Sequence, residues 1–242
     1  MITTVNKIKR FPQLPLKPSN SAILASVIGF ELVIVAIYLG SILLTGEPYA
    51  PFDMNGQMTI PSFLQAFYLF AIGLIALMLF VTERRSKLPP SGGFKLAIAI
   101  LLLYATLDEI FEIHLQLDNW FSVLGKGDWM GIYLGVFSIA PAVWYKDVRK
   151  LWRVYRQEAL IVLLGLTLLI VGGLGAELFK GSFRVIIGLL FQHDFIIFFA
   201  EKVRVAIEEF SELLGETLIL YAAFLFLKKR RRCRFLFARG SG

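Results

Sequence analysis

Long apolar stretches without charged residues constrain this chain more than any other feature of its sequence. Such stretches cover residues 21–46, interrupted only by Glu31, and residues 61–82, 129–145 and 159–176. At about 1.5 Å per helical residue, each reaches or nearly reaches the roughly 30 Å thickness of a bilayer core. Because 57% of the 242 residues are hydrophobic, the sequence predicts an integral membrane protein built from α-helices.

Two further spans are predicted where acidic residues interrupt the apolar pattern, at residues 96–116 and 203–227. Basic residues of membrane proteins concentrate on the cytoplasmic side. A six-span arrangement with both ends inside places all but five of the 25 Lys and Arg residues on one side. We therefore predict an all-α bundle of six transmembrane helices in the cell inner (plasma) membrane, with both termini cytoplasmic.

This topology divides the chain into a cytosolic N-terminal arm, a six-span transmembrane domain and a basic cytosolic tail, at residues 1–20, 21–228 and 229–242. The apolar stretch 185–200 contains His193 and Asp194. We expect it to form an interfacial or re-entrant helix on the outer face before the last span, either separate from that span or continuing into it, instead of a seventh crossing. The basic run 228–234 directly follows a span, which favours anchoring to the inner leaflet over nucleic-acid binding.

Acidic residues form the one group in this sequence that is typical of a chemical site, because carboxylates are rare within membrane spans and usually mark a function there. At about 100° per residue, the acids of the last predicted span fall within an arc of roughly 100°. These acids are Glu208, Glu209, Glu212 and Glu216. The third span carries a similar stripe, formed by Asp108, Glu109 and Glu112. Since the two spans run in opposite directions, both stripes are expected at the same depth of the outer leaflet.

Two more residues are candidates for the same cluster. Glu177 ends the fifth span, and small residues that let a neighbouring helix approach closely precede it at positions 172, 173 and 175. His114 lies on a different face from the acids of a regular helix, so it joins them only if the helix unwinds or ends nearby. His193 could add a second imidazole, although a lone His beside a span is more typical of the membrane interface.

Several carboxylates in a low dielectric must hold protons, pair with Arg or Lys, or bind a cation. The nearby basic residues are fewer than the acids. Carboxylate oxygens together with one imidazole are suitable ligands for a divalent metal such as Fe, Mn, Zn, Mg or Ca. However, the sequence lacks the Glu-x-x-His pair that is typical of dimetal sites in helix bundles. The predicted metal ligands are Asp108, Glu109, Glu112, His114, Glu177, Glu208, Glu209 and Glu212.

Two motifs resemble a set of uncharacterised bacterial multi-pass membrane proteins. One is Leu107-Asp108-Glu109 followed by His114, which matches L-D-E-x4-H at the end of a span. The other runs from Glu208 to Gly215 and matches E-E-x2-E-x2-G at the start of the last span. The resemblance implies a site at these acids and a bacterial origin, and it implies no particular activity.

Three functions remain open from the sequence. The leading hypothesis is a cation or metal site in the outer half of the bundle, which in an enzyme would support metal-assisted oxidation or hydrolysis of a lipid-soluble substrate. The alternatives are a cation or proton transporter, and a non-catalytic subunit or assembly factor that binds a membrane-protein partner or another copy of itself. The acids can also simply lie solvated at the outer rim, paired with Lys202 and Arg204. Apart from the lipid bilayer, no partner follows from the sequence, and nucleic acid is not expected.

Overall fold

The computed structural model describes residues 18–83, 88–113, 116 and 129–239, and every regular element within these ranges is a helix. In chain order these are α1 (Pro18–Thr45), η1 (Ala50–Phe52), α2 (Ile60–Thr82), α3 (Gly92–Phe111), α5 (Trp129–Val143), α6 (Tyr145–Val154), α7 (Arg156–Leu168), η2 (Leu169–Leu174), α8 (Gly175–Leu190) and α9 (Asp194–Arg239). The short element η1 is a 3₁₀ turn, and η2 is a π-helical segment that joins α7 to α8.

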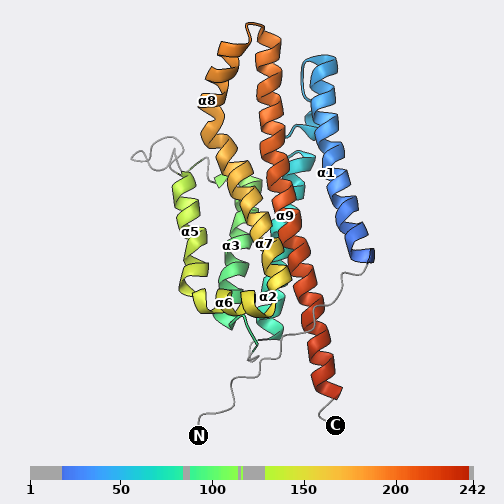
Figure 1. Ribbon diagram of the computed structural model, residues 1–242, viewed down its shortest axis with the longest axis vertical. Coiled ribbons are helices and arrows are strands. Elements are labelled where there is room, and N and C mark those ends of the chain that lie inside the picture. The colour runs from blue at the N-terminus through green and yellow to red at the C-terminus, as the bar shows by residue number, and fades with distance from the viewer. Residues whose placement is uncertain (1–17, 84–87, 114–115, 117–128, 240–242) are drawn as a thin grey trace.

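Helix α9 is the centre of the bundle. It runs along most of the length of the molecule and packs against α1, α2, α7, η2 and α8 (Figure 1). Helix α3 makes its main contacts with α2 and α5, on the side away from α1. We call the end where α8 turns into α9 the hairpin end, and the opposite end, where α9 finishes, the tail end. Helix α6 lies across the bundle axis toward the tail end (Figure 1).

Four helical segments among the described residues are long and apolar enough to cross a membrane. They are Ser21–Thr45, Ile60–Thr82, Arg156–Leu190 and Asp194–Arg231. Four of the six predicted crossings are confirmed to this extent. The other two positions also form helices, α3 and α5, but α3 carries Lys95, Asp108 and Glu109 within 20 residues and α5 has only 15 residues.

The segment expected as one interfacial or re-entrant helix is a helical hairpin, and only its second half continues into the last span. Its first part completes α8, and its second part forms the first turns of α9. The chain turns at residues 191–193, where the carbonyl oxygen of His193 accepts hydrogen bonds from the amides of Ile196 and Ile197 at 3.0 and 3.2 Å. Asp194 lies in the first turn of α9, where a negative charge interacts favourably with the helix dipole. The polar pair His193-Asp194 therefore starts a new helix.

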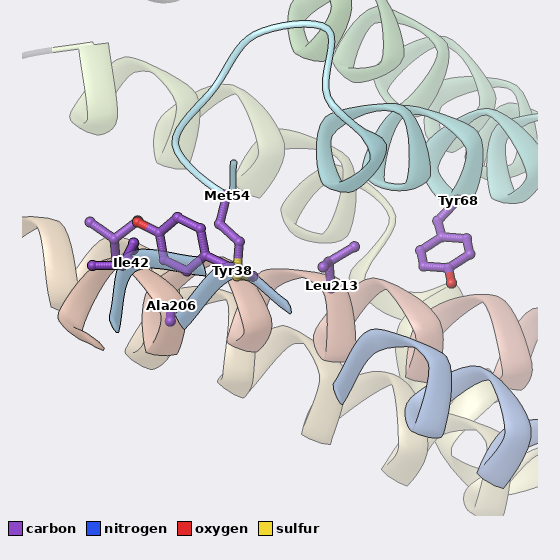
Figure 2. Close-up of a cluster of buried hydrophobic side chains, with 7 residues drawn as sticks. Tyr38, Ile42, Met54, Tyr68, Ala206 and Leu213 are labelled. Atoms are coloured by element: carbon purple, nitrogen blue, oxygen red, sulfur yellow. The ribbon is translucent and has the colours of Figure 1, made fainter. Parts of the chain in front are cut away.

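The apolar core lies between α1, α2 and α9 toward the hairpin end. Tyr38 and Ile42 of α1 contact Ala206 of α9, and Met54 from the loop after η1 covers them (Figure 2). Leu213 and Tyr68 continue the core further along α9. This packing determines which faces of α1 and α2 contact α9. It therefore also determines which polar residues of α1 and α2 lie next to α9.

Glycines bring α7 and η2 into backbone contact with α9. A Cβ atom built on Gly165 would lie 2.6 Å from the carbonyl oxygen of Gly215, and one built on Gly215 would lie 2.8 Å from that of Gly165. In η2, a Cβ on Gly172 would meet Ser211 at 2.2 Å, and one on Gly173 would meet Glu212 Oε1 at 2.3 Å. Small residues at such positions allow helices to approach closely within membranes. We call this contact the glycine seam.

Buried ion pairs close the tail end. Lys229 donates to Glu158 of α7 at 3.2 Å, and Arg230 donates to Glu83 at the end of α2. Arg230 also donates to the carbonyl oxygens of Leu88 and Pro89 in the connection to α3. The basic run after the last span was expected to anchor to the inner leaflet. Two of its cations are buried inside the protein instead, because acids at the ends of two other helices pair with them.

Candidate functional site

The acids of α9 follow one face of the helix, as predicted. Glu208, Glu209, Glu212 and Glu216 lie in three consecutive turns of a regular α-helix. Residues four apart on a helix have Cβ atoms about 5–6 Å from each other. The four carboxyl groups therefore form a continuous row, which starts at Glu208 nearest the hairpin end and finishes at Glu216.

A buried glutamine of α2 joins two members of this row. Gln65 is 3% exposed, and its side-chain amide nitrogen donates to Glu209 Oε2 at 3.3 Å and to Glu212 Oε2 at 3.4 Å. An amide NH₂ group has two donor hydrogens and can serve both acceptors. Gln65 thus holds the two glutamates side by side without neutralising either charge.

The row continues into the middle of the bundle through Glu31 of α1. Glu31 is fully buried, and its Oε1 accepts hydrogen bonds from Thr217 Oγ1 at 2.5 Å and from Tyr68 OH at 3.1 Å. Glu216, adjacent to Thr217 in the chain, is close enough to Glu31 for a Coulombic interaction. We call Glu209, Glu212, Glu216 and Glu31 the carboxyl row.

Two oxygen atoms of the carboxyl row have no hydrogen-bond partner within the described part of the chain. They are Oε2 of Glu31 and Oε2 of Glu216, on side chains that are 0% and 5% exposed. None of the ion pairs among the described residues involves the carboxyl row. A buried carboxylate without a counter-ion is costly, since it has lost the hydration of its charge.

Arg204 satisfies the acids nearest the hairpin end. Its guanidinium group is 2.6 Å from Glu208 Oε2 and 3.3 Å from Glu201 Oε2, and it also donates to the carbonyl oxygen of Ala176 at 3.4 Å. Glu208, predicted as a metal ligand, is therefore in an ion pair. The same arginine ties α9 to the first turn of α8, and it separates the carboxyl row from the hairpin.

The acids of the third predicted span point to three different places. Asp108 accepts a hydrogen bond from Tyr133 of α5 at 2.8 Å, and Tyr133 is in turn 2.9 Å from the hydroxyl of Tyr104. Glu109 lies within Coulombic range of the carboxyl row. Glu112 lies beyond the last residue of α3 with a φ of 48°, and its Oε2 accepts a hydrogen bond from Gln57 in the loop before α2.

The prediction of a single stripe on this span is therefore wrong. The prediction required a helix that stays regular through residue 112. In the structure, α3 ends at Phe111, and the left-handed backbone of Glu112 turns its side chain toward another loop. Of the three acids, only Glu109 remains near the glutamates of α9. His114 lies outside the described residues.

Glu177 lies at the edge of the predicted cluster. It pairs with Lys180 on the same helix at 3.1 Å and its side chain is 35% exposed, but it remains within Coulombic range of Glu208 and Glu212. The glycines before it do produce a close helix contact, but the carboxylate that they meet is Glu212 of α9. His193 lies in the turn between α8 and α9.

No group of three or more His, Cys, Asp or Glu side chains in the described ranges is arranged to hold a metal ion. Three of the predicted metal ligands have another partner: Asp108 accepts a hydrogen bond from Tyr133, Glu208 pairs with Arg204, and Glu177 pairs with Lys180. The remaining acids form a row along α9 instead of converging on one point.

Sequence reasoning missed the neutral partners of this row. Gln65, Tyr68 and Thr217 are all buried and all donate to its glutamates. The available signal was a single amide inside the otherwise apolar stretch 61–82. A buried polar side chain normally has a hydrogen-bond partner, so Gln65 could have been matched with the acids of another span.

The model of a protein family described as a domain of unknown function, DUF8692, matches residues 25–227. This match includes most of each candidate span and the whole carboxyl row. Comparison with curated proteins and with solved structures finds no match.

Proposed function

The chain belongs to the DUF8692 family, and we propose from the geometry of its site that it is a proton-coupled membrane transporter in which the carboxyl row binds the proton. A carboxyl group that is buried without a counter-ion becomes neutral by taking up a proton. One observation carries the proposal. Four glutamates lie in one row, the hydrogen-bond donors to three of them are uncharged, and two of their oxygens have no partner in the described part of the chain.

The order of the groups gives the direction of proton entry. Arg204, Glu208 and Glu201 form a charged cluster at the hairpin side of the row, and we infer that the proton enters there. From there the carboxyls proceed through Glu209 and Glu212 to Glu216 and Glu31. Neighbouring carboxyls on α9 are close enough for a single water molecule to bridge them.

The same proposal includes the six-span topology. Helices α3 and α5 would complete the crossings, and the tail end would be cytoplasmic, because α6 and the last turns of α9 place their basic residues there. The proton would then enter from the outer side, in the leaflet where the sequence predicted the site.

The test is infrared spectroscopy of the purified protein in nanodiscs. A protonated carboxyl group has a C=O stretching band that a carboxylate lacks. We expect wild-type protein at neutral pH to have this band and the variants Glu212→Gln, Glu216→Gln and Glu31→Gln to lose intensity in it. Glu47→Gln is the matched control, because Glu47 is exposed in the loop after α1.

Two results would overturn the proposal. One is the absence of the band in wild-type protein at neutral pH. The other is a stoichiometric divalent metal in the purified protein that the Glu212→Gln variant fails to bind, which would make the row a metal site.

A pH jump across a supported membrane provides an independent check, since proton uptake into the row should produce a transient charge displacement that Glu31→Gln and Glu212→Gln reduce.

A further inference from the structure

Helix α6 runs in a different direction from the long helices of the described part of the chain (Figure 1). It spans Tyr145–Val154 and lies across the bundle axis, between the end of α5 and the start of α7 (Figure 1). A crosswise helix of ten residues cannot cross a bilayer, because its length is only about 15 Å and it lies roughly in the plane of the membrane.

Aromatic residues hold both ends of α6 in place. At its start, the ring of Trp144 packs edge-on against Phe94 of α3, and a Cβ on Gly93 would lie 3.1 Å from the same ring. At its end, Tyr155 is buried and packs against Phe226 of α9 with ring centroids 4.6 Å apart. These contacts fix the rotation of α6, so each of its faces has a defined environment.

One face of α6 is basic and exposed. At about 100° per residue, four cations fall within an arc of roughly 100°. These are Lys146, Arg149, Lys150 and Arg153, and all four are exposed. None of the ion pairs in the described part of the chain involves them. The single acid of the helix, Asp147, is buried on a different side.

A neighbouring face of α6 is apolar and equally exposed. Tyr145, Val148 and Trp152 lie side by side in the helical projection, and their exposed fractions are 58%, 39% and 40%. Tyr and Trp at the surface of a membrane protein favour the headgroup level, where one end of the ring is apolar and the other is wet. The helix therefore offers an apolar face to acyl chains next to a basic face at the same depth.

We propose that α6 is a binding site for anionic phospholipid headgroups at the tail end of the bundle. The apolar face would enter the boundary between headgroups and acyl chains, and the basic face would contact the phosphates. This is the arrangement of an interfacial amphipathic helix, whose binding combines apolar burial with attraction to anionic lipid. Because aromatic contacts already order the helix, lipid binding has no folding cost at this site.

The occupant follows from the two faces together. A soluble phosphate or a nucleic acid would use the cations but leave Trp152 and Val148 in water. A neutral phospholipid would cover the apolar face but leave four clustered like charges without counter-ions. A lipid with an anionic headgroup satisfies both faces.

The experiment uses the full chain purified in a neutral detergent and reconstituted into nanodiscs of phosphatidylcholine with or without phosphatidylglycerol. Native mass spectrometry would count the bound lipids, and thermal unfolding would measure their effect. We expect phosphatidylglycerol to bind and raise the unfolding temperature, and the double variant Arg149→Gln/Lys150→Gln to bind it roughly 30-fold more weakly, as the loss of two charge contacts implies. Added salt should reduce the wild-type effect by screening.

The matched control is Lys180→Gln/Arg184→Gln, which removes two exposed cations from α8 and should leave phosphatidylglycerol binding unchanged. A second readout tests the apolar face. Lipids brominated near the headgroup should quench the protein's tryptophan fluorescence, and Trp152→Phe should reduce that quenching, although Trp120, Trp129 and Trp144 still contribute to the signal. Stabilisation by inorganic phosphate equal to that by phosphatidylglycerol would overturn the proposal in favour of a soluble anion. Equal losses in the α6 and α8 variants would also overturn it, because the effect would then be one of net charge.

Discussion

The glycine seam makes a quantitative prediction, because two of its glycines face backbone atoms that cannot rotate away. An added methyl group at Gly165 would have its carbon 2.6 Å from the carbonyl oxygen of Gly215 and 2.8 Å from Ile219 Cγ1. Ordinary contacts of this kind are about 3.5–4 Å long. The Gly165→Ala variant can relieve the overlap only if α7 and α9 move apart along their contact.

The size of the effect follows from two opposing contributions. Overpacking a well-packed contact costs about 1–3 kcal/mol, and a clash with backbone belongs at the upper end of this range. Alanine is favoured over glycine within a helix by about 1 kcal/mol, which offsets part of the cost. We therefore expect Gly165→Ala to lower the free energy of unfolding by about 2 kcal/mol.

Gly40 provides the matched control. It lies in α1, and a Cβ atom there would meet nothing within 4 Å. Gly40→Ala should raise the free energy of unfolding by about 0.5–1 kcal/mol, through helix propensity alone. The assay is unfolding by SDS in mixed micelles, followed by circular dichroism. Equal stability of Gly165→Ala and Gly40→Ala would refute the reasoning, since it would mean that the two helices are not in backbone contact.

Gly173 separates the stability of the fold from the integrity of the site. A Cβ there would lie 2.3 Å from Glu212 Oε1, at the end of a side chain that can rotate. Gly173→Ala should therefore cost less stability than Gly165→Ala, but it should displace Glu212 from Gln65 and shift the infrared band of the carboxyl row. A band identical to that of wild type would show that Glu212 does not occupy the position described here.

Substitutions that test three further contacts use the same unfolding assay. Glu31→Gln should leave the free energy of unfolding unchanged, since an amide mimics a protonated carboxyl. Glu31→Ala should lower it by about 1–3 kcal/mol, because two buried hydroxyl groups lose their acceptor. Similar losses for both variants would argue that Glu31 is ionised. Arg230→Ala should lower the free energy of unfolding by about 1.5–3 kcal/mol, because it removes a charged hydrogen bond to Glu83, which keeps its second buried ion pair with Lys95 at 3.6 Å. The exposed neighbour Arg231→Ala should have no measurable effect, so equal effects would contradict the buried pair. Tyr133→Phe should cost about 1.5–3 kcal/mol if its hydrogen bond to Asp108 forms as described, and no change would count against that bond.

The main helices could be predicted because their signals are local. An uncharged apolar stretch of sufficient length predicts a crossing without knowledge of its neighbours, and four such helices are present. The acidic face of α9 could be predicted for a related reason. Helical periodicity needs only a regular helix, and α9 stays regular throughout its 46 residues.

The composition of the site could not be predicted, because it depends on where a helix ends and on contacts between distant residues. Glu112 does not lie on the same helix face as Asp108 and Glu109, because α3 ends one residue before it. Gln65 and Glu212 are 147 positions apart in the sequence, and no local pattern in either span indicates that they meet. Asp108, Glu208 and Glu177 each bind a different partner instead of one shared metal ion, and these partners are also known only from the packing.

The depth of Glu31 decides what kind of proton pathway the carboxyl row can be. Helix α1 has 28 residues and Glu31 is its fourteenth, so the row ends near the middle of the span. Between Thr217 and Lys228, α9 presents only apolar side chains apart from Tyr221. A continuous proton channel needs polar groups or water along its whole length, because an unsatisfied polar species in hydrocarbon is costly. Under the proposed function, the row would therefore load a proton from one side only. Release to the other side would require a second arrangement of the helices around Glu31, as in a transporter and unlike a channel.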